Sequence, residues 1–139
     1  MGDRKLRALI VDDDRAIRSE LREMLERNHC VAVDEASDGP DGLAKMSESR
    51  YDLLFLDMVM PRMDGAVVLQ RLNGAAFYLP RYIVAMSGVA SGDVFKRAAY
   101  EGGAHESIYK PVTSDDVLWA LDILRLRDYA EELLDPART

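Results

Sequence analysis

Residues that could do chemistry stand at the ends of apolar stretches in this chain. Asp12 and Asp13 directly follow the stretch ALIV, and Asp57 follows LLFL. Two further stretches, YIVAM and IY, are followed by Ser87 and Lys110. Carboxylates that lie close together repel one another and are costly to keep ionised without a cation. If these segments converge, the three acids predict a hard divalent cation with oxygen ligands, for which Mg²⁺ is the best match.

The same groups suit the transfer of a phosphoryl group. A divalent cation and the ammonium of Lys110 would neutralise the oxygens around phosphorus, and the hydroxyl of Ser87 would donate a hydrogen bond to one of them. Asp57 would then act as the nucleophile and become an aspartyl phosphate. The residue types therefore predict phosphoryl chemistry on a carboxylate.

The elements that must position these residues alternate between strand and helix. The run at 53–56 is so apolar that it predicts a strand buried on both faces, with Asp57 at its carboxyl end. Strand patterns lie at 6–11, 30–36, 53–56, 82–86 and 108–109. A helical pattern follows each one, beginning near residues 15, 40, 64, 91 and 113. Five such units predict an α/β fold, a single doubly wound parallel sheet whose carboxyl ends share one edge.

Composition excludes several other classes of protein. A chain of 139 residues predicts one domain, and its net charge of −7 argues against a nucleic-acid surface, which should be basic. The single cysteine, Cys30, cannot form an internal disulfide, which favours a reducing, cytoplasmic location. Apolar runs stay well short of the ~20 residues of a membrane span, so we expect no membrane partner.

Taken in order, the motifs LIVDDD, LLFLDMVMPRMDG, MSG and YKP resemble those of the response regulator receiver domain, the phosphoacceptor module of two-component signalling. The resemblance covers residues 5–126 and leaves 127–139 as a C-terminal helical extension or linker. It implies a flavodoxin-like sheet in the strand order 2-1-3-4-5 and a cis bond between Lys110 and Pro111. It also implies a protein that accepts a phosphoryl group from a sensor histidine kinase or phosphotransfer protein, and that is not a turnover enzyme.

The resemblance carries residue roles onto this chain. Asp57 would be the phosphoacceptor, Ser87 the switch hydroxyl and Lys110 the residue that pairs with phosphate. The Mg²⁺ ligands it implies are Asp12, Asp13, Asp57 and the backbone carbonyl of Val59. Phosphorylation would change the surface formed by the fourth helix, the fifth strand and the fifth helix.

Two positions depart from the family pattern or modify it. The family places an aromatic residue three positions before the lysine, where this chain has Ser107, while an aromatic residue stands instead at Tyr109. Tyr109 either replaces the missing ring or simply packs at the sheet edge. In this family the residues two positions beyond the phosphoacceptor and the switch hydroxyl line the path of the attacking water. The resemblance places Val59 and Val89 there, and because neither can orient water, it predicts a long-lived phosphorylated state.

Three rival functions deserve comparison. A phosphatase with an aspartate nucleophile needs a second acid two residues later, where this chain has Val59. A flavin-binding protein needs a phosphate loop after the first strand, where Asp12 and Asp13 would repel phosphate. The alternative that stays open is a degenerate receiver that acts mainly as a dimerisation or protein-interaction module.

The final helix carries two apolar stripes. Val117, Leu121 and Leu124 share one face at about 100° per residue, and we expect them to pack on the sheet. A second stripe on nearly the opposite face alternates spacings of four and three, the period of a coiled-coil seam. Its members are Trp119, Ile123, Leu126, Ala130 and Leu133. We expect this stripe to be a contact surface, either for a second copy in a homodimer or for a helical linker into an output domain.

Overall fold

The structure, a computed structural model, describes residues 5–28, 30–88 and 92–135. Five strands alternate with five helices along these residues. The strands are β1 (Leu6–Val11), β2 (Val31–Ala36), β3 (Leu53–Asp57), β4 (Tyr82–Ser87) and β5 (Glu106–Tyr109). The helices are α1 (Arg15–Glu26), α2 (Gly39–Glu48), α3 (Gly65–Leu72), α4 (Gly92–Glu101) and α5 (Ser114–Leu134).

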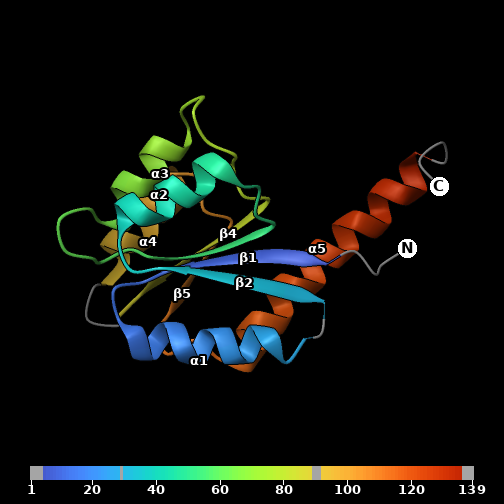
Figure 1. The fold of residues 1–139 in the computed structure, drawn as a ribbon, viewed down its shortest axis with the longest axis horizontal. Coiled ribbons are helices and arrows are strands. Elements are labelled where there is room, and N and C mark those ends of the chain that lie inside the picture. The colour runs from blue at the N-terminus through green and yellow to red at the C-terminus, as the bar shows by residue number, and fades with distance from the viewer. Residues whose placement is uncertain (1–4, 29, 89–91, 136–139) are drawn as a thin grey trace.

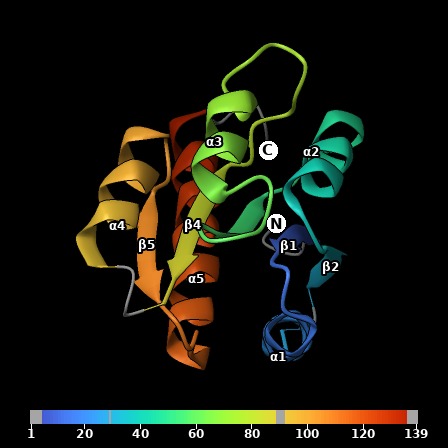
Figure 2. The ribbon, with the colours of Figure 1, turned by 90° about the vertical axis from the view of Figure 1, so that its left-hand side faces the viewer.

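All five strands are parallel and form one sheet in the order β2-β1-β3-β4-β5, with β2 and β5 at the two edges (Figure 2). In this register Val11 lies beside Leu56, and Asp57 lies beside Met86. The carboxyl ends of β1, β3 and β4 are therefore level with one another. Both the α/β class and the strand order that we expected are confirmed.

Alternation along the strands divides the core into two layers. Leu54 and Leu56 of β3 belong to a cluster under α2, α3 and α4, whereas Leu53 and Phe55 belong to a cluster under α1 and α5. The ribbon shows α1 and α5 on one face of the sheet and the other three helices on the opposite face (Figure 1). Because β3 is buried on both faces, it forms a rigid support for Asp57.

Three of the predicted helix starts are confirmed by their caps, whereas residue 91, near which the fourth was expected, lies outside the described residues. The side chain of Asp14 accepts a hydrogen bond from the Ala16 N–H at 2.9 Å and so begins α1. Asp64 accepts from the Val67 N–H at 3.1 Å and begins α3. Thr113 and Asp116 form a reciprocal capping box at the start of α5.

The last helix follows the expected pattern with one change. Val117, Leu121 and Leu124 are fully buried against the sheet, as predicted. Of the second stripe, Trp119 and Leu126 are exposed, but Ile123 is half-buried against the core under α1 and α5. Ile123 lies closer to the sheet than the expected contact surface requires.

Within the described residues, no helix has the length and apolar character needed to cross a membrane.

Candidate functional site

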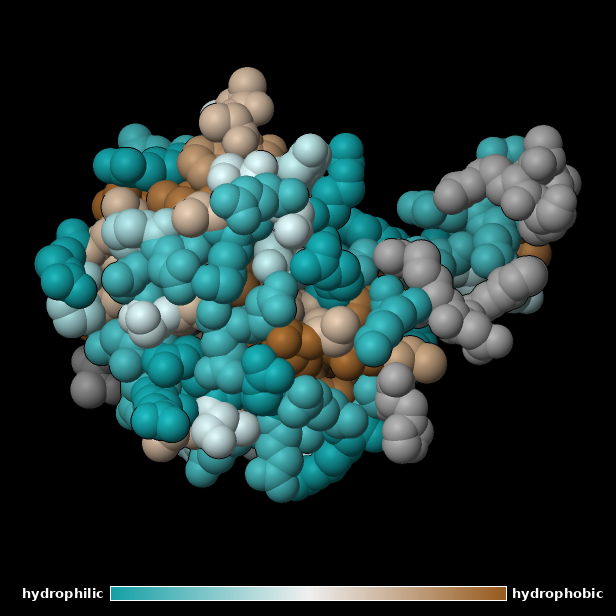
Figure 3. All heavy atoms as spheres, in the orientation of Figure 1, coloured by the Kyte–Doolittle hydropathy of each residue, from teal (hydrophilic) through white to brown (hydrophobic). Residues whose placement is uncertain are grey.

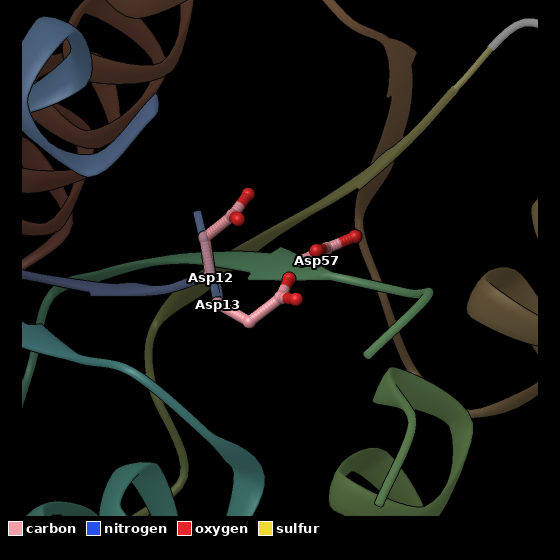
Figure 4. Close-up of side chains that lie close together, drawn as sticks. All are labelled: Asp12, Asp13 and Asp57. Carbon is pink, nitrogen blue, oxygen red and sulfur yellow. The ribbon is translucent and has the colours of Figure 1, made fainter. Parts of the chain in front are cut away.

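The three acidic residues that we singled out meet at the carboxyl edge of the sheet. Asp12 and Asp13 follow the end of β1, and Asp57 ends β3 (Figure 4). One carboxylate oxygen from each lies within 4.8 Å of the others. Asp12 and Asp57 are buried, whereas Asp13 is exposed. The cluster therefore combines two buried acids with one that is open to solvent.

Lys110 joins the cluster from the end of β5. Its Nζ lies 2.8 Å from Oδ2 of Asp12 and 3.2 Å from Oδ2 of Asp57. Burial lowers the pKa of Lys110, but the carboxylates of Asp12 and Asp57 outweigh this and leave the pKa above its ordinary value. The ammonium is therefore a fixed positive charge between the two buried acids. The sequence predicted that Lys110 lies at this edge, but it did not predict the contact of Lys110 with Asp12.

The carboxyl group of Asp57 is strongly perturbed. Burial raises its pKa to about 6, even though a hydrogen bond from the Val59 N–H at 3.0 Å and the charge of Lys110 both favour the ionised form. The charge of Asp12 pushes the pKa in the same direction as burial. A carboxylate whose charge is poorly compensated by its surroundings is a good nucleophile and a good metal ligand.

Ser87 completes the edge at the end of β4. Its side chain is 2% exposed, and its hydroxyl oxygen has no hydrogen-bond partner among the described residues. Oδ2 of Asp12 likewise has no well-aligned hydrogen bond, although it is in ionic contact with Lys110. Buried polar atoms without partners are uncommon in folded proteins. Both atoms are available to a ligand that binds at this edge.

The donor set fits a divalent cation that prefers oxygen. Asp12, Asp13 and Asp57 offer carboxylate oxygens from two strand ends, with the hard character that Mg²⁺ favours. Oδ1 of Asp12 accepts a hydrogen bond from the Asp14 N–H at 2.8 Å, and Oδ2 is the oxygen in contact with Lys110. Val59, whose carbonyl the resemblance implied as a further ligand, lies in the loop between β3 and α3 and is 47% exposed.

Arg18 is a residue of the site that sequence reasoning missed. From α1 it donates a hydrogen bond through Nη1 to the backbone carbonyl of Asp12 at 2.8 Å. Its Nε pairs with Glu35 of β2 at 3.1 Å, and Arg22 pairs with the same carboxylate. The only signal in the sequence is an arginine five residues after Asp13, and an arginine on an exposed helix surface would look the same.

The β5 side of the site departs from the resemblance as expected. Ser107 carries no ring, and its backbone N–H donates to the hydroxyl of Tyr100 of α4 at 3.2 Å. Tyr109 is 42% exposed, and its hydroxyl donates to Asp93 of α4 at 3.2 Å. Tyr109 therefore points outward toward α4, and it lies beside Ser87 in the register of β4 and β5. The bond between Lys110 and Pro111 is cis, as the resemblance implied.

The histidines lie away from the acidic edge or outside the described residues. Nδ1 of His105 accepts a hydrogen bond from the Ile83 N–H at 2.9 Å, and its ring stacks on Tyr82. Burial and the charge of Arg127 lower the pKa of His105, so the neutral ring serves as an acceptor that extends the pairing of β4 and β5. His29 and Val89 lie outside the described residues.

Fold and site together define a doubly wound, flavodoxin-like α/β protein with a cluster of acidic residues at the carboxyl edge of its sheet. Residues 8–122 match the family model of the response regulator receiver domain, and the chain belongs to this family. The resemblance inferred from the motifs is thereby confirmed.

Named relatives agree with this assignment. The chain is 35% identical over 127 residues to the response regulator MprA of Mycobacterium tuberculosis, covering 91% of this chain and 54% of the relative. A CheY-like receiver domain from Methanospirillum hungatei superimposes with a TM-score of 0.75 at 28% identity, covering 91% of this chain and 98% of the other. The chemotaxis protein CheY4 of Vibrio cholerae gives 0.74 at 26% identity, covering 86% and 98%.

These similarities identify a receiver domain of two-component signalling, a family that typically interacts with histidine kinases and is generally not made of turnover enzymes. The chain spans about half the length of the curated relatives that it matches. What those longer proteins do outside the matched region therefore says nothing about this chain.

Proposed function

We propose that this chain accepts a phosphoryl group on Asp57 from the phosphohistidine of a partner kinase or phosphotransfer protein. The observation that carries the proposal is the contact of one ammonium, Lys110, with two buried carboxylates beside a buried hydroxyl that has no partner in the described structure. The oxygens of a phosphoryl group on Asp57 would give the Ser87 hydroxyl a hydrogen-bond acceptor and would pair with the ammonium of Lys110.

In this transfer each side chain of the cluster has its own role. A carboxylate oxygen of Asp57 attacks phosphorus in line, the new P–O bond forms, and the P–N bond to the donor imidazole breaks with its electron pair going to that nitrogen. Lys110 is positioned to pair with the phosphoryl oxygens once Asp57 carries them, and Ser87 can donate its hydroxyl hydrogen to one of them. When bound by Asp12, Asp13 and Asp57, Mg²⁺ would supply positive charge that offsets the charge on the phosphoryl oxygens.

The carbonyl of Val59 would complete that ligand set, as the family pattern implies. The resulting phosphoaspartate carries about two negative charges at neutral pH, and we expect the surface built from α4, β5 and α5 to respond to it. Because Ser107 replaces the usual aromatic residue, the response would run through Tyr109 and α4. The same substitution is what favours the second candidate, a degenerate receiver that serves only as an interaction module.

Intact mass spectrometry separates the two candidates. The wild type is incubated with Mg²⁺ and acetyl phosphate, and we expect one phosphoryl group per chain. Asp57→Asn should take up none, while Asp64→Asn, which keeps a good helix cap on α3, should behave as the wild type. A wild type that stays unmodified while Mg²⁺ binds would contradict phosphorylation and favour the interaction module.

A further inference from the structure

Two charged side chains between α1 and β2 are more buried than the surface around them suggests. Hydrophilic side chains gather over α1 in Figure 3, where charged groups are ordinarily solvated. The side chain of Arg18 is nevertheless only 14% exposed, and that of Glu35 is 27% exposed. Because a partly buried charge must be paired and hydrogen-bonded to be stable, the contacts of these two residues define their role.

Glu35 accepts hydrogen bonds from two arginines of α1. Its Oε1 accepts one from Nε of Arg18 at 3.1 Å, and its Oε2 accepts one from Nε of Arg22. Arg22 also donates through Nη2 to the carbonyl of Val33 at 3.1 Å. Burial raises the pKa of Glu35, but the hydrogen bonds and charges of Arg22 and Arg18 outweigh it and hold the pKa below its ordinary value. Glu35 is therefore an ionised group that fixes two side chains of α1 against β2.

The guanidinium of Arg18 also reaches the peptide bond between Asp12 and Asp13. Its Nη1 donates to the carbonyl of Asp12 at 2.8 Å, and this carbonyl belongs to the peptide that joins the two acids. The N–H of Asp12 donates to the carbonyl of Ala36 at 3.2 Å, so β2 holds the other side of the residue. Because Asp12 is buried, its carbonyl needs a donor. Rotation of this peptide would redirect both carboxylates.

Glu35 also balances the charge that Arg18 brings close to the acids. An unpaired guanidinium beside the acidic cluster would oppose the binding of a second cation, because like charges repel. The carboxylate of Glu35 offsets this charge, so Arg18 can supply its hydrogen bond to Asp12 with little net charge. Arg22 has a second acid of its own, since its Nη1 lies 3.3 Å from Oε2 of Glu26.

We propose that Glu35 is a positioning residue of the metal site. It holds Arg18 in the orientation that fixes the peptide between Asp12 and Asp13, and this peptide sets where the two acids place their oxygens for a divalent cation. Glu35 does not touch the cation and acts only through Arg18. This role rests on the metal site of the proposed function, but it does not depend on the transfer of a phosphoryl group.

Calorimetric titration of the unphosphorylated chain with Mg²⁺ measures the effect. Glu35→Gln keeps the shape of the side chain but has one acceptor oxygen where two arginines each need one, so the dissociation constant for Mg²⁺ should rise severalfold. Glu35→Asp, which keeps both oxygens, should recover part of the affinity. The matched control is Asp34→Asn, which removes the neighbouring acid of β2 from its contacts with Arg7 and Tyr51 and should bind Mg²⁺ as the wild type does.

A double-mutant cycle tests whether Glu35 acts through Arg18. Arg18→Ala should weaken Mg²⁺ binding, and adding Glu35→Gln to it should have little further effect, whereas independent residues would give additive losses. A second readout needs no metal. In the metal-free chain, Glu35→Gln should shift the NMR signal of the Asp13 amide, which belongs to the peptide that Arg18 holds, while Asp34→Asn should leave this signal in place.

Phosphate uptake separates the role of Glu35 from the proposed function. An unchanged Mg²⁺ affinity in Glu35→Gln, losses that add in the double variant, or an Asp13 signal that does not shift would overturn the positioning role and leave phosphorylation of Asp57 standing. A wild type that binds Mg²⁺ with the expected dependence on Glu35, but takes up no phosphoryl group from acetyl phosphate, would contradict only the proposed function. A wild type that binds no Mg²⁺ would overturn both.

Discussion

The ionised carboxylate of Asp57 is held at a cost to the stability of the fold. It is 2% exposed, and burial raises its pKa from 3.8 to about 6. This rise is worth about 3 kcal/mol, because each pKa unit corresponds to about 1.4 kcal/mol. Without a divalent cation, the ionised side chain therefore destabilises the folded chain at pH 7 by up to about 3 kcal/mol.

Asp57→Asn removes this cost while keeping the shape of the side chain. Its amide oxygen can still accept the hydrogen bond from the Val59 N–H, but the contact with Lys110 at 3.2 Å loses its charge. Allowing for that loss, we expect the free energy of unfolding to rise by about 1–2 kcal/mol at pH 7 in EDTA. Urea denaturation followed by circular dichroism measures the difference.

The pH dependence gives the sign of the effect. Because the pKa of Asp57 is higher in the folded state, the folded chain binds more protons than the unfolded chain between about pH 4 and pH 6. The wild type should therefore lose stability as pH rises through this window, and the advantage of the Asn variant should be full above pH 6 and absent below pH 4. Mg²⁺ should stabilise the wild type and leave the variant nearly unchanged. An Asn variant that is less stable than the wild type at pH 7 in EDTA would refute this reasoning.

Three other substitutions test separate parts of the site. Lys110→Ala should still bind Mg²⁺, but phosphorylation of this variant should not change the conformation of α4. Hydrogen exchange of α4 with and without phosphodonor measures this. A change in exchange as large as that of the wild type would count against the prediction. Val59→Asn should speed loss of the phosphoryl group, because the amide can orient the attacking water as valine cannot, and a mass time course checks this; slower loss would contradict it. Arg18→Ala should raise the Mg²⁺ concentration for half-maximal phosphorylation severalfold, because the Asp12 carbonyl loses its 2.8 Å hydrogen bond. At saturating Mg²⁺ the extent of phosphorylation should equal that of the wild type, and Arg18→Lys should recover part of the lost Mg²⁺ affinity. A Mg²⁺ titration of Arg18→Ala that matches the wild type would show that Arg18 does not support the metal site.

The fold could be predicted because its strongest signals are local. The run at 53–56 is apolar on both strand faces, and the helices expected near residues 15, 64 and 113 have the capping residues Asp14, Asp64 and Thr113 at their starts. The main boundary error fell at the last strand, which begins at Glu106 and not at Ile108. An edge strand with only half-buried side chains gives a weak hydrophobic pattern.

The site could be predicted in its members but not in its contacts. Strand ends place Asp12, Asp57 and Lys110 at one edge, and that follows from the order of the elements. The hydrogen bond from Arg18 to the Asp12 carbonyl depends on the crossing of α1 over β1, which sequence spacing does not determine. Ile123 was expected on an exposed contact surface but is half-buried against the core. Helical spacing shows which residues share a face of the helix, but not how much of that face the rest of the domain covers.

Two tyrosine hydroxyls connect α4 and β5 near Ser107, the position at which the family's aromatic residue is missing. The hydroxyl of Tyr100 accepts a hydrogen bond from the backbone N–H of Ser107, and the hydroxyl of Tyr109 donates one to Asp93. These two hydrogen bonds connect α4 to β5 at two positions along the strand. Tyr109 is also the register neighbour of Ser87, and the Lys110 N–H donates to the Ser87 carbonyl at 2.8 Å. A displacement of Ser87 toward a phosphoryl group would therefore pull on the end of β5 through the backbone. If Ser87 moves in this way, we expect α4 to follow β5 through the hydrogen bonds of Tyr100 and Tyr109, without a rotating aromatic side chain.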